Sequence, residues 1–308
     1  MLKRLDWFFL TRPIVLIPSW AFLLAGYLRA HERHGESSPP VGPLVPAFLL
    51  LTVVLAGVYV INQIFDRETD RKNEKLYLLA EGHVPVRGAW ILAVALIGAG
   101  LAATAIYRSV WLPWLGAAAL LGYLYSAPPV RLKGRPVVDL LANGIGYGGI
   151  TFLFGSLIGA PAEGEGGVAP VHALPYAFLV GAVFLHTALV DKDGDREAGL
   201  STSAIVLGDR ATSISAFLLL AAAAASAIVL GEPYAAYAAI GSAPFFLWGV
   251  VAPGKKGSTL GYQWGSLLFV ILLVIREPLF GLLLAFVVLV TRLYYRFRFG
   301  KVYPSLDL

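Results

Sequence analysis

Two acidic segments of the chain share a spacing that places carboxylates side by side. The first reads Asn62-Gln-Ile-Phe-Asp66-Arg-Glu-Thr-Asp70, and the second reads Asp191-Lys-Asp193-Gly-Asp195. In a helix, residues four positions apart lie on nearly the same face, because each step of four advances the chain by about 400°. The three polar residues of the first segment therefore share one face, as do Asp191 and Asp195.

Carboxylates in this pattern are typical ligands of a hard cation. Magnesium prefers oxygen ligands, binds one or two carboxylates and completes its shell with substrate phosphates. We therefore predict a site for two Mg²⁺ ions with a diphosphate between them. Its protein ligands are Asp66, Asp70, Asp191 and Asp195. For either segment alone, solvated loop residues or helix caps are an equal interpretation; the matched spacing of the two segments favours the metal site.

The elements that must position these carboxylates are membrane helices. The chain is 58% hydrophobic and 14% charged, with a mean hydropathy of +0.73, whereas a soluble domain carries roughly 25% charged residues. Continuous apolar runs of about 20 residues indicate transmembrane helices rather than a barrel. They fall at 13–28, 43–65, 85–106, 110–125, 138–159, 170–190, 212–230, 233–252 and 261–295. We predict an all-α, polytopic membrane bundle.

The number of helices depends on the last run, which is interrupted at Arg276-Glu277-Pro278. Proline disfavours helix in the residue before it, so this run contains either one span or two. The sequence thus predicts nine or ten transmembrane helices in a single domain, 1–308. The acidic segments open the loops 62–84 and 191–202, and a basic loop covers 125–137.

The distribution of Lys and Arg predicts the orientation, because short cytoplasmic loops retain positive charge. With a cytoplasmic N-terminus, the inner loops 66–88, 126–137 and 191–210 carry eleven basic residues. The outer loops together carry three. We therefore expect a multi-pass protein of the cell membrane with both acidic segments on the cytoplasmic side. The charge forms no long basic stripe, so no nucleic-acid partner is expected.

Basic and polar residues near the acidic segments are further candidates. Lys75, Arg131 and Lys133 are placed to meet a diphosphate, whose developing charge positioned cations stabilise; positive-inside topology alone also explains them. Tyr125 is either a cavity residue or part of an interfacial aromatic belt. Asn143, inside the fifth run, either faces a cavity or bonds a neighbouring helix.

Taken together, these motifs resemble the UbiA superfamily of intramembrane prenyltransferases. Asn62, Asp66 and Asp70 match its N-x-x-x-D-x-x-x-D motif, and Asp191 and Asp195 match its D-x-x-x-D motif. Arg12-Pro13 resembles the family's opening. The segment Tyr125-Ser-Ala-Pro-Pro resembles the branch containing chlorophyll synthases and digeranylgeranylglyceryl phosphate synthases. The chain departs from the family at Tyr77-Leu78, where an Arg-Pro pair is common.

The resemblance implies a helical bundle around a central cavity that opens sideways to lipid. It implies Mg-assisted ionisation of an allylic polyprenyl diphosphate and transfer of the isoprenyl chain to a lipophilic or aromatic acceptor. The four aspartates would hold metal, Asn62 would orient the first metal shell, and the three basic residues would bind the diphosphate. Tyr125 would stabilise the carbocation through its ring face. Asp66, Asp191 and Tyr125 are thus the expected catalytic residues, and Asn143 is expected to line the cavity.

Two other functions stay open on the sequence. A divalent cation transporter would also place carboxylates in membrane helices, although transport sites tend toward the midplane and these carboxylates lie at span ends. A membrane terpene cyclase or diphosphatase would use the same donor without an acceptor. Product analysis in the absence of acceptor separates this second alternative from a transferase.

Overall fold

The computed structural model describes residues 2–33, 35, 40–72, 77–160 and 167–304. This part of the chain is helical and contains no strand, which confirms the predicted all-α class. Its helices are α1 (Leu2–Phe9), η1 (Pro13–Leu16), α2 (Ile17–Arg33), α3 (Val41–Lys72), α4 (Tyr77–Ala80), α5 (Val86–Arg108), η2 (Ser109–Trp111), α6 (Leu112–Ser126), η3 (Leu132–Gly134), α7 (Val138–Asn143), η4 (Gly144–Thr151), α8 (Phe152–Ile158), η5 (Pro170–Ala173), α9 (Leu174–Glu197), α10 (Ser203–Leu230), α11 (Pro233–Val251), α12 (Lys255–Arg276) and α13 (Pro278–Phe299).

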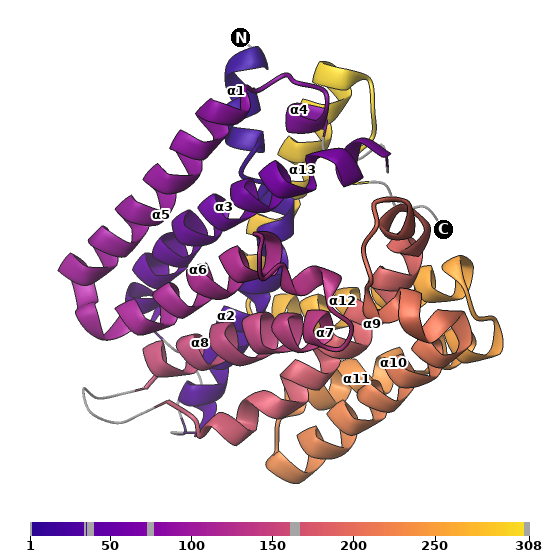
Figure 1. The fold of residues 1–308 in the computed structure, drawn as a ribbon. Coiled ribbons are helices and arrows are strands. Elements are labelled where there is room, and N and C mark those ends of the chain that lie inside the picture. Colours follow the sequence, from indigo (N-terminus) through magenta and orange to yellow (C-terminus); the bar gives the residue numbers. More distant parts are fainter. Residues whose placement is uncertain (1, 34, 36–39, 73–76, 161–166, 305–308) are drawn as a thin grey trace.

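Within the described residues, nine segments are long and apolar enough to cross a membrane. One of them, Val86–Ser126, consists of α5 and α6, which fold back on each other around η2 (Figure 1). The run 261–295 contains two helices, because α12 ends at Arg276 and α13 begins at Pro278. Glu277 between them is not helical, with φ −130° and ψ 87°. The higher of the two predicted helix counts is therefore favoured.

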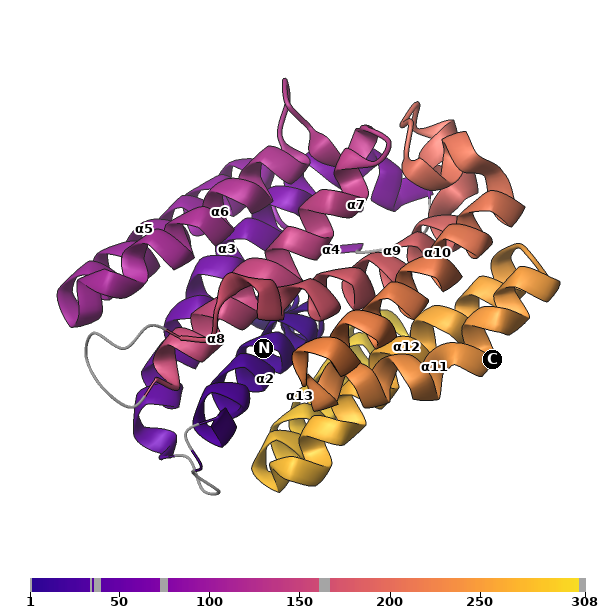
Figure 2. The same cartoon turned by 90° about the horizontal axis from the view of Figure 1, so that it is seen from below.

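The helices form two groups with a shared middle (Figures 1 and 2). Helix α3 packs against α5 and α6 on one side, and α9 to α12 pack together on the other. Between the groups lie α2 and the continuous span formed by α7, η4 and α8. This arrangement leaves α3, α6, η4 and α9 around a common interior.

Glycines bring α2 and α8 into direct backbone contact. A Cβ added to Gly26 would lie 1.9 Å from the carbonyl oxygen of Phe152, and one added to Gly155 would lie 2.0 Å from that of Leu23. Small residues allow membrane helices to approach this closely. The contact holds the first transmembrane helix against the span that follows the basic loop.

The end of α13 lies on the same face of the bundle as the acidic segments. Asp6 of α1 accepts hydrogen bonds from Tyr294 (2.7 Å) and from Arg298 (3.0 and 3.1 Å) of α13. Gln63 of α3 donates a hydrogen bond to the carbonyl of Leu10, just after α1 (2.7 Å). The basic end of α13, the N-terminal helix and the first acidic segment are thus joined.

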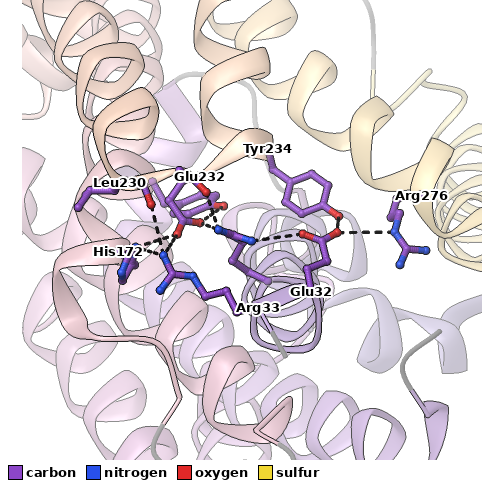
Figure 3. A network of polar contacts seen from close by, with 10 residues as sticks. Glu32, Arg33, His172, Leu230, Glu232, Tyr234 and Arg276 are labelled. Carbon is purple, nitrogen blue, oxygen red and sulfur yellow. Dashed lines mark hydrogen bonds and ion pairs between the residues drawn. The ribbon is translucent and has the colours of Figure 1, made fainter. Parts of the chain in front are cut away.

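An ion network holds the opposite face together (Figure 3). At its centre, the fully buried Glu232 sits in the short Gly231-Glu232 connection between α10 and α11. Its carboxylate accepts hydrogen bonds from Arg29 and Tyr176, each at 3.1 Å, and lies 2.8 Å from His172 Nδ1. Burial raises the pKa of Glu232. The network therefore links α2 to the start of α9 and to the α10–α11 turn.

Candidate active site

A cavity of about 420 Å³ lies between α3, α6, η4 and α9. Eight of the residues singled out in the sequence line it, namely Asn62, Asp66, Asp70, Tyr125, Lys133, Asn143, Asp191 and Asp195. Arg131 does not line this cavity but lies beside it, and Lys75 lies outside the described residues. The structure thus brings the two acidic segments and part of the basic loop to one place.

The first acidic segment is the end of the long helix α3, as its spacing predicts. Asn62 donates two hydrogen bonds from its amide nitrogen, to Asp66 Oδ2 (2.8 Å) and to Ser126 Oγ (3.0 Å). Asp66 is itself buried. The amide of Asn62 therefore fixes one carboxylate oxygen of Asp66 and ties α3 to the end of α6.

The second acidic segment occupies the last turns of α9. Asp191 and Asp195 line the cavity, while Asp193 between them is exposed to solvent. Helix α9 ends at Glu197, and Gly199 follows in the left-handed conformation with φ 74°. After this turn, Thr202 also lines the cavity. The i, i+4 spacing thus sorts the aspartates of α9 into two that face the cavity and one that faces water.

The basic loop brings a cation to the first acidic segment. Lys133 Nζ lies 2.5 Å from Asp66 Oδ1, and Arg131 Nη2 lies 3.9 Å from the same oxygen. Arg131 adopts the left-handed conformation, with φ 40°. Non-glycine residues held in this region of φ/ψ space often cluster at functional sites. The loop thus presents two positive side chains to the end of α3.

Tyr125 and Asn143 are neighbours in the cavity lining. Asn143 donates from Nδ2 to the carbonyl of Asp139 at 2.8 Å, and its side chain is also a polar neighbour of Tyr125 in the cavity lining. Asp139 is buried and accepts hydrogen bonds from Ser203 N (2.8 Å) and Leu140 N (2.7 Å). Asp139 thereby links the start of α7 to the start of α10, directly after the second acidic segment.

Four cavity residues were not candidates on the sequence. Arg12, in the left-handed conformation with φ 55°, donates from Nη1 to Asn62 Oδ1 at 3.4 Å. Deeper in the cavity, the hydroxyls of Tyr59 and Tyr147 lie 2.8 Å apart, and Ser19 Oγ lies 3.5 Å from that of Tyr59. Tyr147 stands on the π-helix η4, a rare form frequently found at functional sites. The only sequence signal was the Arg12-Pro13 pair.

The donor set of the cavity fits a hard divalent cation. The described lining contains four aspartates and no histidine, and the chain contains no cysteine. Oxygen ligands suit Mg²⁺, whereas imidazole and thiolate suit zinc and other transition metals. Among the described residues, no three acidic or imidazole side chains stand close enough to hold one ion by themselves. The four aspartates therefore suit metal ions whose coordination shell is completed by the phosphate groups of a bound substrate.

Comparison with known proteins gives the family. A sequence profile of the UbiA prenyltransferase family matches residues 19–260. A digeranylgeranylglyceryl phosphate synthase of Halobacterium salinarum is 36% identical over 71% of this chain and 75% of its own length. A lycopene elongase/hydratase of Haloferax volcanii is 36% identical over 68% of this chain, a match that spans only 65% of that relative.

A solved structure shares the fold. The UbiA homologue of Archaeoglobus fulgidus bound to GPP and Mg²⁺ superimposes with a TM-score of 0.61, covering 86% of this chain and 99% of that one at 24% identity. Its similarity extends over the helices that build the bundle, while the profile match covers most of the residues around the cavity. On these matches, the chain belongs to the UbiA prenyltransferase family.

Proposed function

We propose that this protein transfers an isoprenyl chain from a polyprenyl diphosphate to a lipophilic acceptor. The observation that carries the proposal is the convergence of four aspartates from α3 and α9 with Lys133 in one cavity. A solved family member binds GPP and Mg²⁺, and two relatives are named for lipid products or lipid substrates. A prenyl diphosphate donor and a divalent metal are therefore proposed here too.

The donor's two parts match the two parts of the cavity. Aspartates, Asn62 and Lys133 line one part, while Leu55, Val58 and Leu121 belong to the apolar lining. We infer that the charged part holds the diphosphate and the apolar part holds the isoprenyl chain. An apolar pocket also limits the access of water to a reactive carbocation.

Each charged residue has a distinct proposed role. Asp66, Asp70, Asp191 and Asp195 would hold two Mg²⁺ ions, which when bound neutralise charge on the leaving diphosphate. Asn62 fixes Asp66, and Lys133, Arg131 and Lys75 would bind diphosphate oxygens as the carbon–oxygen bond breaks. The Tyr125 ring would face the developing carbocation, held there by Asn143. A nucleophilic atom of the acceptor forms the new bond to that carbon, and the acceptor then loses a proton, which completes the transfer.

We further infer that the chain forms one integral domain of the cell membrane, with the acidic segments on the cytoplasmic side. The basic loops support this orientation, because eleven of their Lys and Arg residues lie on the predicted inner side. The diphosphate group of the donor would then be bound at the cytoplasmic side. The prenylated acceptor would stay in the bilayer.

The test is turnover of a radiolabelled polyprenyl diphosphate by purified protein, with membrane lipid extract as the source of acceptor. Asp66→Asn and Asp191→Asn should each reduce Mg-dependent transfer at least about 100-fold. Asp193→Asn is the matched control, because this exposed aspartate of the same segment faces away from the cavity. Wild-type-like transfer in both cavity variants would refute the proposal; product formed equally without acceptor would indicate a cyclase or diphosphatase.

A further inference from the structure

Three hydroxyl groups meet in the part of the cavity that lies farther from the acidic segments. The hydroxyls of Tyr59 and Tyr147 lie 2.8 Å apart, and Ser19 Oγ lies 3.5 Å from the Tyr59 hydroxyl. All three residues line the cavity, and they come from α3, η4 and α2. We call them the hydroxyl cluster. Leu55 and Val58, on the same stretch of α3, also line the cavity, so the cluster is polar within largely apolar surroundings.

The hydroxyl cluster lies about one helical turn deeper than the proposed diphosphate site. Tyr59 precedes Asn62 by three residues, which is about 4.5 Å along α3, and Tyr147 follows Asn143 by four residues. Helix α3 ends in the acidic segment and α7 begins after the basic loop, so both tyrosines lie on the membrane side of these asparagines. The isoprenyl carbon that carries the diphosphate would reach this depth. An acceptor atom that attacks this carbon must therefore lie near the hydroxyl cluster.

The hydroxyl cluster has one hydrogen-bond donor left for a ligand. Each hydroxyl carries one proton and two acceptor lone pairs. The two contacts within the cluster use two of the three protons, and the described part of the chain gives these hydroxyls no other hydrogen bond. By contrast, Thr151 and Thr187, which also line the cavity, donate to carbonyls of their own helices at 2.9 and 3.0 Å. Because a buried donor without a partner is costly, the cluster favours a ligand that brings an oxygen atom.

We propose that the hydroxyl cluster binds a hydroxyl group of the acceptor, so that the protein forms an ether. The inference rests on the proposed function. The cluster can donate one hydrogen bond to the acceptor oxygen and accept one from its O–H, whereas an alkene carbon offers neither. A lone pair of that oxygen forms the new bond to the isoprenyl carbon, while the carbon–oxygen bond to the diphosphate breaks and its electron pair stays on the diphosphate. The hydroxyl proton passes to the released diphosphate, and the tyrosines keep their own protons.

The first measurement identifies the bond that forms. Purified protein receives radiolabelled polyprenyl diphosphate, Mg²⁺ and membrane lipid extract, which is either untreated or acetylated to block its free hydroxyls. We expect acetylation to reduce transfer at least about tenfold, because a site that hydrogen-bonds a substrate hydroxyl rejects a substrate without one. Hydriodic acid, which cleaves ethers, should release the labelled chain from the product. Equal transfer to acetylated extract, a product that resists the acid, or a labelled prenyl alcohol as the main product would overturn the inference.

Two substitutions test the residues themselves. Tyr59→Phe and Tyr147→Phe should each raise the amount of extract that gives a half-maximal rate about tenfold, the effect of one lost hydrogen bond. The Ki of inorganic pyrophosphate, measured with Mg²⁺ as a competitor of the donor, should stay unchanged, because the diphosphate lies one turn away. Since the two hydroxyls act as a unit, the double variant should lose less than the product of the single effects. Tyr123→Phe is the control, because this tyrosine is 41% exposed on α6 and does not line the cavity.

The two readouts separate acceptor binding from a structural role. Parallel changes in acceptor saturation and in pyrophosphate binding, or unchanged acceptor saturation in both variants, would overturn the inference while leaving the proposed function intact. A wild-type protein that transfers no labelled chain to either extract would instead refute the proposed function. Thermal unfolding of each detergent-solubilised variant excludes loss of fold as the cause.

Discussion

Lys133 Nζ lies 2.5 Å from Asp66 Oδ1, so a protein cation contacts an oxygen that we assign to metal. When donor and metal bind, the Lys133 side chain should therefore move from the Asp66 carboxylate to the diphosphate. Lys133 can reach the diphosphate because it lies on the short η3 turn and lines the cavity.

Replacing Lys133 by Gln removes a cation from the leaving group. We expect transfer to fall about 10- to 100-fold in kcat/KM, because positioned charges stabilise the transition state more than the free donor. Steady-state kinetics with varied donor measures this. Arg135→Gln is the control, since Arg135 is exposed and its side chain donates to the carbonyl of Pro129 in the same loop. Equal effects of the two substitutions would contradict a specific role for Lys133.

The proposed role of Tyr125 concerns its ring more than its hydroxyl. Tyr125→Phe keeps the electron-rich face and should retain transfer within about fivefold. Tyr125→Leu should reduce kcat at least about tenfold, because a cation over an aromatic face gains up to about 2 kcal/mol in a desolvated site. Single-turnover rates at saturating donor distinguish this effect from weaker binding. If Leu works as well as Phe, the ring has no electrostatic role.

The backbone contact between α2 and α8 makes Gly26 intolerant of a side chain. Gly26→Ala should destabilise the protein by about 1–3 kcal/mol, because the new Cβ would lie 1.9 Å from the Phe152 carbonyl oxygen. Thermal unfolding in detergent measures the loss. Gly98→Ala in α5 is the matched control: its Cβ meets open space, and alanine favours helix over glycine. A Gly26→Ala variant as stable as Gly98→Ala would mean that α2 and α8 are farther apart.

The buried carboxylate of Glu232 predicts a pH dependence of stability. Burial raises its pKa above the ordinary value of 4.5, so the folded state binds its proton more tightly than the unfolded state. Its contribution to stability is then complete below pH 4.5 and is lost as the pH rises through the raised pKa. Glu232→Gln cannot titrate. We expect the melting temperature of the wild type, relative to this variant, to decrease between about pH 4 and pH 8; a difference that increases over this range would contradict the prediction.

The break at Glu277 predicts where the end of α13 lies relative to the membrane. Since the chain has no cysteine, a single introduced cysteine is a unique reporter. Lys301→Cys and Glu81→Cys should react with a membrane-impermeant maleimide from the same side, and Ser109→Cys from the other. All three positions are exposed. Labelling of Lys301→Cys together with Ser109→Cys would instead indicate an odd number of crossings.

Local rules predicted the parts of the site that depend on helix geometry. The i, i+4 spacing placed Asp66 with Asn62, and Asp191 with Asp195, on the faces where the structure has them. The hydrogen bond of Arg12 to Asn62 joins residues that are far apart in the chain, and no periodicity encodes it. Likewise, the pairing of Tyr59 with Tyr147 depends on packing between α3 and a π-helix, which apolar patterning cannot distinguish from an α-helix.

The glycine seam between α2 and α8 also limits how reactants reach the interior. Two helices that touch main chain to main chain leave no room for an acyl or isoprenoid tail to slip between them from the bilayer. Lipid-soluble reactants must therefore approach along another seam of the bundle. A bulky substitution that blocks the actual entry path would slow the transfer of long isoprenyl chains more than that of short ones. A substitution that separates α2 from α8 would not increase the rate of transfer.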